Sequence, residues 1–535
     1  MPENTVIETW METRDGVKLY TVVQLPNAEG RFPLIVRRSP YAREKINAEE
    51  WKNEKMPGNG KYGLVFQHCR GTGLSEGICI PYASEHNDGL DLLEWIRKQP
   101  FYQGELYLSG GSYLSSVHFS YLNTNPPDVK AAVLTVQDSE RYNILYRNGF
   151  FKSGLHGSWS MSMYKRNLPI ERNFCSDTFL TLPLKGITRT VFGEEVPEIE
   201  AEYCHPDPAD PYWQTPDGGS EYHDACRNCD IPILLITAFY DIYTGGVLDI
   251  WNGLPEERKK RCACIVTPFS HDYNPMPRTT PSELPDFENA RLREICPDLE
   301  INWFEHFRNG EPLKFAEQGK IKYYTLFENQ WHCGERLENG TENREFFLHP
   351  DRTLKPGRPA DSSEITYVYN PYAPARFDGG CCLNFGGMQF QDPPNSRYDI
   401  ISFLSDPIEE ETVVCQGKFE VELHCRSTAP DTCFYVRLDL VRDGRAICLR
   451  DDIDSLCRLE KDYMPGSERI LKFSLIEHSF QLRKGDQLRL DVSSSCVPHF
   501  QVHTNRKGLQ ADQTGADICR NTIITGKSVL RIHCR

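Results

Sequence analysis

The stretch LYLSGGSYLS, residues 106–115, is an apolar run that ends in glycines and a serine and then continues as a helix-like segment. This pattern predicts a strand that turns abruptly into a helix, a turn that lifts the hydroxyl of Ser112 above the edge of a sheet. Only small neighbours let the backbone pass so closely. The first N–H groups of a helix lack acceptors within it, so the Tyr113 N–H is aimed at any oxyanion formed beside Ser112. We interpret the stretch as a nucleophile elbow.

The stretch departs from the strict Gly-x-Ser-x-Gly pattern, because Leu114 stands at the last glycine position and small Ser115 follows it. Taken alone, it is as typical of an ordinary strand-to-helix turn as of a catalytic serine. The interpretation therefore depends on partners elsewhere in the chain.

Two later apolar runs supply such partners. Residues 231–238 have the pattern of a buried strand that delivers Asp241 to its C-terminal end, and residues 262–267 form another that ends shortly before His271. Open parallel sheets place their chemistry at the carboxyl ends of strands. An aspartate after a strand is often only a turn or helix cap, and a lone histidine is often structural. Ser112, Asp241 and His271 follow one another along the chain in the order serine, acid, histidine, and this order favours a catalytic triad.

Periodicity divides the chain into three parts. Residues 1–140 and 230–340 alternate strand-like and helix-like segments, which predicts a parallel, doubly wound α/β sheet that forms the catalytic domain. Residues 141–229 lack strand alternation and predict a helical cap inserted over the C-terminal edge of that sheet. Residues 341–535 show period-2 strands separated by turn sequences, which predicts a β-sandwich.

Composition limits the class of protein. The chain has 535 residues, of which 39% are hydrophobic and 11% aromatic, as expected of a large folded enzyme with several domains. A net charge of −16 without a Lys/Arg cluster argues against a nucleic-acid partner. No apolar stretch is long enough to span a membrane, and the polar N-terminus shows no secretory signal, so we expect a cytoplasmic protein without a membrane partner.

Twenty cysteines raise metal binding or redox chemistry as an alternative function. Cys226 and Cys229 have the spacing of a metal or redox half-site, but no second half-site of like spacing accompanies them. We therefore expect no metal site. Without an export signal we also expect reduced thiols rather than a disulfide framework.

The motifs together resemble the cocaine-esterase and X-prolyl dipeptidyl-peptidase family of serine hydrolases, which also includes α-amino-acid ester hydrolases and glutaryl-cephalosporin acylases. The similarity runs almost end to end and is carried, besides the elbow, by Arg38-Ser39-Pro40-Tyr41, residues 69–77, residues 87–96, Tyr240-Asp241, Ser270-His271 and residues 427–432. It implies an α/β-hydrolase sheet with an inserted helical cap and a C-terminal all-β jelly roll. Ser115 is a departure, because elbows of this family usually end in glycine there.

The resemblance also implies a second oxyanion donor, the Tyr41 phenol, which would join the Tyr113 N–H. In the resulting mechanism His271 removes the proton from Ser112, Asp241 holds the imidazole tautomer, and an acyl-enzyme forms and is hydrolysed. No cofactor is required.

We therefore expect a serine hydrolase that cleaves an ester or amide bond of a small acyl compound or short peptide. Trp159, Phe239 and Tyr243 are the expected pocket walls, and the aromatic enclosure favours a bulky, uncharged acyl group. An X-Pro dipeptidyl-peptidase or an α-amino-acid ester hydrolase or acylase would instead need a carboxylate for a free ammonium. Composition offers as candidates only Glu198, Glu200, Glu202, Asp207 and Asp210, which are also typical of a solvated acidic surface. A non-catalytic jelly-roll binding protein is the non-enzyme alternative, and homo-oligomerisation stays open.

Overall fold

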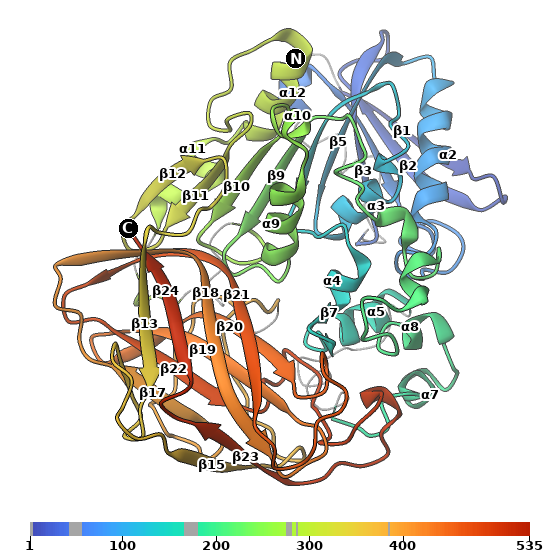
Figure 1. Ribbon diagram of the computed structural model, residues 1–535. Helices are drawn as coiled ribbons and strands as arrows, with labels where there is room; N and C mark the ends of the chain where they lie inside the picture. The colour runs from blue at the N-terminus through green and yellow to red at the C-terminus, as the bar shows by residue number, and fades with distance from the viewer. Residues whose placement is uncertain (1–3, 42–55, 165–179, 274–280, 285–286, 384–385) are drawn as a thin grey trace.

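The computed structural model describes residues 4–41, 56–164, 180–273, 281–284, 287–383 and 386–535. Two large sheets dominate it, one in the N-terminal part of the chain and one in the C-terminal part (Figure 1). The N-terminal sheet has the strand order β1 (Thr5–Glu12), β2 (Lys18–Leu25), β4 (Gly63–His68), β3 (Phe32–Ser39), β5 (Tyr102–Gly111), β6 (Val129–Thr135), β9 (Ile233–Ala238), β10 (Ala263–Thr267), β11 (Ile321–Thr325) and β12 (Gln330–Gly334).

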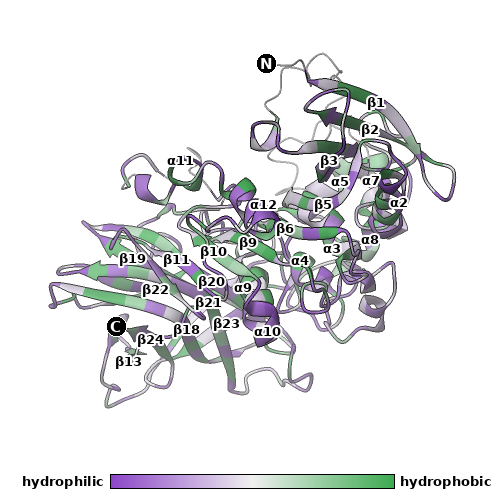
Figure 2. Ribbon diagram, turned by 90° about the horizontal axis from the view of Figure 1, so that it is seen from above, coloured by the Kyte–Doolittle hydropathy of each residue, from purple (hydrophilic) through white to green (hydrophobic). Residues whose placement is uncertain are grey.

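Every neighbouring pair from β4 to β11 is parallel, whereas β1–β2, β2–β4 and β11–β12 are antiparallel. Parallel strands are buried on both faces, which requires near-continuous apolar runs. The β9 sequence ILLITA is such a run, and each of its residues is buried. Figure 2 shows the hydrophobic character of this central part of the sheet.

Helices cover both faces of the sheet. Apolar side chains of α2 (Glu85–Arg97), α3 (Tyr113–Leu122) and α9 (Thr244–Gly253) belong to the core on one face. On the other face, α12 (Leu299–Asn309) contributes Trp303 and Phe304 to a second core. Two short helices complete this domain, α10 (Glu256–Lys259) and α11 (Leu292–Ile295).

A long insertion separates β6 from β9. It contains α4 (Arg141–Leu145), the two-stranded ladder of β7 (Tyr146–Arg147) and β8 (Phe150–Phe151), α5 (His156–Tyr164), α7 (Ile187–Phe192) and α8 (Pro197–Ala201). The helices are short, and the β7–β8 ladder is an element that the sequence pattern did not predict.

The C-terminal sheet is all-β and mostly antiparallel. Along it lie β15 (Glu364–Tyr369), β23 (Cys519–Ile524), β18 (Thr412–Ser427), β24 (Val529–Cys534), β13 (Glu342–Leu348), β14 (Thr353–Lys355), β17 (Ile401–Ser405), β22 (Gln487–Ser493), β19 (Cys433–Arg442), β20 (Arg445–Ser455) and β16 (Phe390–Gln391), and β21 (Arg469–Arg483) pairs with β18. The strands fold into two packed layers (Figure 1). The fold predicted from the sequence, an α/β-hydrolase sheet with a cap and a C-terminal jelly roll, is confirmed.

None of the helices in the described part of the chain has the length and apolar character needed to cross a membrane.

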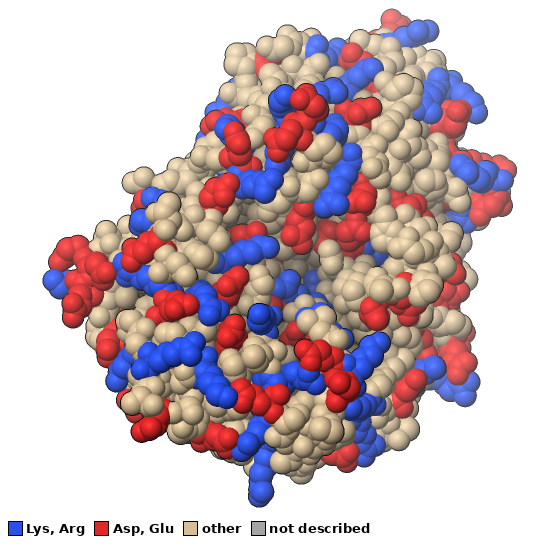
Figure 3. Space-filling view, in the orientation of Figure 1, with Lys and Arg blue, Asp and Glu red and all other residues tan. Residues whose placement is uncertain are grey.

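Basic and acidic side chains are intermingled over the face of the molecule drawn in Figure 3.

Candidate active site

The predicted elbow forms at the junction of β5 and α3. Ser112 precedes the first helical residue and has φ +57° and ψ −131°, a backbone conformation that costs an L-residue about 1–3 kcal/mol. The strand approaches the helix so closely that a Cβ at Gly110 would lie 2.2 Å from the Leu114 carbonyl oxygen. Glycine is therefore required at position 110.

Ser115, the departure from the family pattern, fits this junction by hydrogen bonding. Its fully buried hydroxyl accepts the Thr135 N–H at 2.9 Å and lies 2.7 Å from the Gly110 carbonyl oxygen, to which it donates. The serine thus ties the first turn of α3 to both β5 and β6.

The structure brings the three predicted triad residues together at the carboxyl edge of the sheet. His271 Nε2 lies 2.8 Å from Ser112 Oγ, and His271 Nδ1 lies 2.7 Å from Asp241 Oδ1. The second carboxylate oxygen of Asp241, which is fully buried, accepts a hydrogen bond from Thr237 Oγ1 at 3.1 Å. Because a carboxylate only accepts, Nδ1 carries the proton and Nε2 is free to accept the serine proton.

The loops that carry Asp241 and His271 are bonded to each other. The Phe239 N–H donates to the Thr267 carbonyl at 2.8 Å, and the Tyr240 N–H donates to the Phe269 carbonyl at 2.9 Å. These bonds extend the β9–β10 pairing past the strand ends, so Asp241 and His271 are held in fixed register.

Tyr41 lies beside Ser112 on the segment that follows β3. The Ser39 hydroxyl accepts the Tyr41 N–H at 3.1 Å, and the Tyr41 hydroxyl accepts the Trp159 indole N–H at 3.1 Å. Although 42% of Tyr41 is exposed, its hydroxyl also interacts with Ser112, and burial raises the pKa of the phenol to about 12. The phenol is thus protonated at neutral pH and able to donate.

The Tyr113 side chain is turned into the protein core. Its phenol donates to Glu85 at 2.9 Å and accepts the Tyr82 N–H at 2.7 Å. Glu85 in turn pairs with the fully buried Arg38 at 2.8 Å. The backbone N–H of Tyr113 lies at the first position of α3, where a helical N–H has no acceptor within the helix.

A cavity of about 300 Å³ opens beside Ser112 and His271. Aromatic residues dominate its wall, which consists of Tyr41, Tyr82, Tyr113, Gln137, Leu155, Trp159, Tyr243 and Leu383 together with the serine and histidine. Among these described residues there is no carboxylate. The cavity suits an apolar, uncharged group.

A larger cavity of about 1060 Å³ is also lined by Ser112 and His271. Its wall is more polar and includes ion pairs, with Arg37 bonded to Glu300 at 2.7 Å and Arg293 bonded to Asp272 at 3.1 Å. The negative charges of the Glu300 and Asp272 carboxylates are thus each compensated by a guanidinium.

Of the expected pocket residues, Trp159 and Tyr243 line the smaller cavity, but Phe239 does not. Phe239 is fully buried against the C-terminal domain, where its ring stacks on His478 with centroids 4.5 Å apart. The residue lies on the side of the β9 loop that the jelly roll covers, which the sequence alone does not indicate.

The acidic candidates of the cap do not line either cavity. Glu202 is buried, pairs with Arg141 at 3.4 Å and accepts the Ser160 hydroxyl at 2.5 Å. Glu200 accepts the Gly186 N–H at 2.9 Å, and Asp210 accepts the Tyr212 N–H at 2.9 Å, so both organise the local backbone. Their contacts leave them in structural roles.

Sequence reasoning missed several residues of the site. Tyr82, Gln137, Leu155 and Leu383 line the smaller cavity, and Thr237 orients the aspartate. Arg38 and Glu85 fix the elbow through Tyr113. A signal existed only for Arg38, which belongs to the Arg-Ser-Pro-Tyr motif.

Comparisons with known families match both large parts of the chain. Residues 15–273 match the model described as X-Pro dipeptidyl-peptidase (S15 family), and residues 314–529 match the X-Pro dipeptidyl-peptidase C-terminal non-catalytic domain. A curated relative is a cocaine esterase of Rhodococcus sp. (strain MB1 Bresler), which is 24% identical over 95% of this chain and 93% of its own length.

Solved structures with similar folds cover the whole chain. An aminopeptidase from a marine sediment Thaumarchaeota archaeon superposes with a TM-score of 0.82 at 17% identity, covering 100% of this chain and 97% of its own. An α-amino acid ester hydrolase superposes with a TM-score of 0.83 at 16% identity and with the same coverage of both chains. At these identities the likeness concerns the fold.

Proposed function

Since this chain belongs to the X-Pro dipeptidyl-peptidase (S15) and cocaine-esterase family of serine hydrolases, we propose that it hydrolyses esters of bulky, uncharged carboxylic acids through an acyl-enzyme on Ser112. The proposal assigns the acyl group to the aromatic cavity and the leaving group to the larger one.

In the proposed reaction His271 Nε2 takes the proton of Ser112 Oγ while that oxygen attacks the ester carbonyl. Asp241 stabilises the imidazolium through Nδ1, and the developing oxyanion receives hydrogen bonds from the Tyr41 hydroxyl and the Tyr113 N–H. His271 then returns the proton to the leaving alcohol. Water activated by the same histidine hydrolyses the acyl-enzyme and restores Ser112.

The proposed substrate class rests on which residues form the wall of the smaller cavity. Its described residues are aromatic or aliphatic apart from Ser112, His271 and Gln137. Burying an unpaired ammonium among them would cost several kcal/mol, because no carboxylate of the described wall compensates the charge. A free α-amino group is therefore a disadvantage in the acyl moiety.

The test compares two p-nitrophenyl esters of phenylalanine, one N-acetylated and one with a free amine. The side chain of the acid and the leaving group are identical, so the two esters differ only at the α-nitrogen, in its charge and in the added acetyl group. We expect a higher kcat/KM for the acetylated ester. Preference for the free amine by about tenfold, equivalent to ~1.4 kcal/mol, would reveal an anionic subsite and assign the chain to the aminopeptidase or amino-acid-ester branch.

Trp159 provides a matched pair of variants for the same assignment. Trp159→Ala opens the wall of the acyl cavity and should lower kcat/KM for a phenylacetyl ester more than for an acetyl ester of the same alcohol. Trp159→Phe keeps an aromatic wall and should retain most of this discrimination. Equal losses on both esters would place the acyl group elsewhere.

A further inference from the structure

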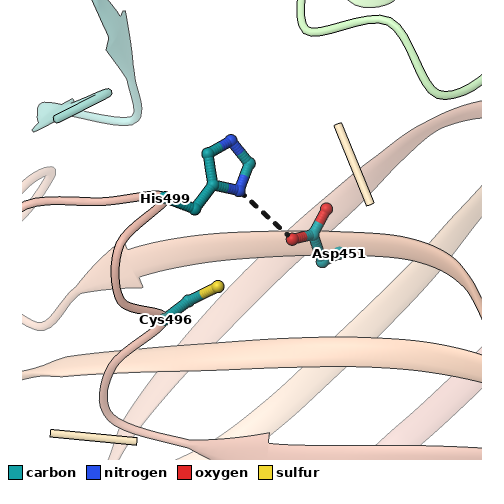
Figure 4. A group of neighbouring side chains, drawn as sticks. All are labelled: Asp451, Cys496 and His499. Carbon is teal, nitrogen blue, oxygen red and sulfur yellow. Dashed lines mark ion pairs between the residues drawn. The ribbon is translucent and has the colours of Figure 1, made fainter. Parts of the chain in front are cut away.

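A cluster of one carboxylate, one thiol and one imidazole lies in the C-terminal domain, outside the site described above. Asp451 comes from β20, and Cys496 and His499 come from the loop that follows β22. One candidate ligand atom of each residue lies within 4.8 Å of the others, and all three residues are buried. Figure 4 shows the Cys496 sulfur and the imidazole directed toward the Asp451 carboxylate. Within the described residues no second group of this kind occurs.

A long ion pair between His499 and Asp451 lies at the centre of the cluster (Figure 4). His499 is 5% exposed, and its Nδ1 has no hydrogen-bond partner. Nδ1 pairs with Asp451 Oδ2 at 3.6 Å, a distance within reach of an ion pair but too long for a hydrogen bond. A buried nitrogen without a hydrogen bond, held only by so long an ion pair, gains from a further ligand placed between the two groups.

The spacing of the three donors matches a small tetrahedral cation. Bonds of about 2.0–2.3 Å to a zinc ion put neighbouring ligand atoms roughly 3.3–3.7 Å apart. The distance of 3.6 Å between His499 Nδ1 and Asp451 Oδ2 lies within that range. The candidate ligand atoms all lie within 4.8 Å of one another, so a pair at that limit would approach by about 1 Å on binding an ion. Cys496-Val497-Pro498-His499 also places a thiol and an imidazole with two residues between them, so both can chelate one ion.

The surroundings support a coordinating role. Tyr435 donates a hydrogen bond to Asp451 Oδ2 at 2.9 Å, the kind of outer contact that orients a ligating carboxylate. Tyr435 and Cys496 belong to a compact apolar cluster, so the polar groups are surrounded by apolar ones. The cross-strand neighbour Arg437 is held by Asp439 at 2.8 Å and Asp491 at 2.6 Å, which compensate its charge.

A fourth coordination position is available on one side. Asp451 and His499 line a cavity of about 70 Å³ between the cap, β9–α9 and the jelly roll. That volume accommodates one or two water molecules. A cation held by three protein ligands can complete its shell with water from this cavity.

We propose that Asp451, Cys496 and His499 form a binding site for Zn²⁺ or a divalent ion of similar chemistry. The thiolate and the imidazole suit such borderline ions, and the carboxylate and the thiolate balance the two positive charges. Binding releases the Cys496 thiol proton to solvent as the sulfur–metal bond forms.

The loop that carries the site is bonded to the cap. Ser153 Oγ donates to the Pro498 carbonyl at 3.1 Å, the Gly154 N–H donates to the His499 carbonyl at 3.3 Å, and the Gln501 N–H donates to the Phe151 carbonyl at 2.9 Å. The cap segment in these bonds leads directly into α5, which presents Trp159 to the acyl cavity. By fixing the loop that is bonded to this cap segment, the ion therefore stabilises the wall of the acyl cavity.

The test measures metal binding by the purified full chain. After exposure to Zn²⁺ and removal of excess by dialysis, we expect one equivalent bound, and titration with Co²⁺ should produce thiolate-to-cobalt charge-transfer absorption. Cys496→Ser should abolish that absorption, and Asp451→Asn should weaken binding by at least the ~10–100-fold typical of losing an outer partner. Cys433→Ser, a buried cysteine of the same apolar cluster, is the matched control and should leave both readouts unchanged.

Wild-type protein that is folded by circular dichroism and shows no thiolate-to-cobalt absorption would overturn the proposal. Equal metal content in wild type and Cys496→Ser would do so as well, because the ion would then lie elsewhere. The readouts do not depend on turnover, so they are independent of the proposed hydrolase activity.

Discussion

Replacing Ser115 by glycine, the residue usual for the family, should destabilise this protein. The hydroxyl is the acceptor for the buried Thr135 N–H at 2.9 Å and lies 2.7 Å from the Gly110 carbonyl oxygen. Leaving the Thr135 N–H unpaired costs about 1–3 kcal/mol, and glycine in place of serine in a helix costs ~0.5 kcal/mol more, which gives roughly 1.5–3.5 kcal/mol in total. Ser115→Ala loses the same bonds but gains helix propensity, so it should be about 1 kcal/mol more stable than Ser115→Gly.

The measurement is urea unfolding of the three proteins, monitored by the tryptophan fluorescence of the N-terminal domain and by loss of turnover. Wild type should have the highest midpoint, Ser115→Ala an intermediate one and Ser115→Gly the lowest. A Ser115→Gly protein as stable as wild type would refute the reasoning, because the serine would then merely occupy a glycine position.

Three further predictions concern the site and its support. Tyr41→Phe should lower kcat by about 10²–10³ with little change in KM, whereas normal kcat with a raised KM would mean that Tyr41 only shapes the pocket. Asp241→Asn should lower kcat by about 10⁴ by favouring the wrong histidine tautomer, and a loss under tenfold would contradict the role of the aspartate. Burial opposes ionisation of Glu305, but hydrogen bonds from Tyr62, Lys61 and Asn309 outweigh it and lower the pKa to about 2. Its stabilisation is thus present above the ordinary pKa and is lost as pH falls toward 2. Glu305→Gln should cost about 1.5–3 kcal/mol in calorimetry at pH 7 and less at pH 3, and an equal cost at both would show that its charge is unimportant.

The parts of the site that follow strands could be predicted from the sequence. Ser112, Asp241 and His271 each come shortly after an apolar run, and parallel strands deliver their carboxyl ends to one edge. The alternation of strands and helices likewise indicated the sheet, and period-2 runs indicated the jelly roll.

Residues that act across domains or through long-range packing could not be predicted. Phe239 lies two residues before Asp241 in the sequence, yet its ring packs on His478 of the jelly roll. Glu85 meets Tyr113 only because α2 packs beside α3, and Arg38 on β3 joins them through its ion pair with Glu85. No periodicity within a single element records such contacts.

The central claim is that Ser112 is the nucleophile, and covalent labelling tests it most directly. A fluorophosphonate should add one adduct to the intact chain, and peptide mass spectrometry should locate the adduct on Ser112. Ser112→Ala should remove both the label and nearly all turnover, with losses on the order of 10⁶ in kcat for such a residue. An adduct on another residue, or a Ser112→Ala protein that keeps a tenth of wild-type turnover on its best ester, would contradict the account.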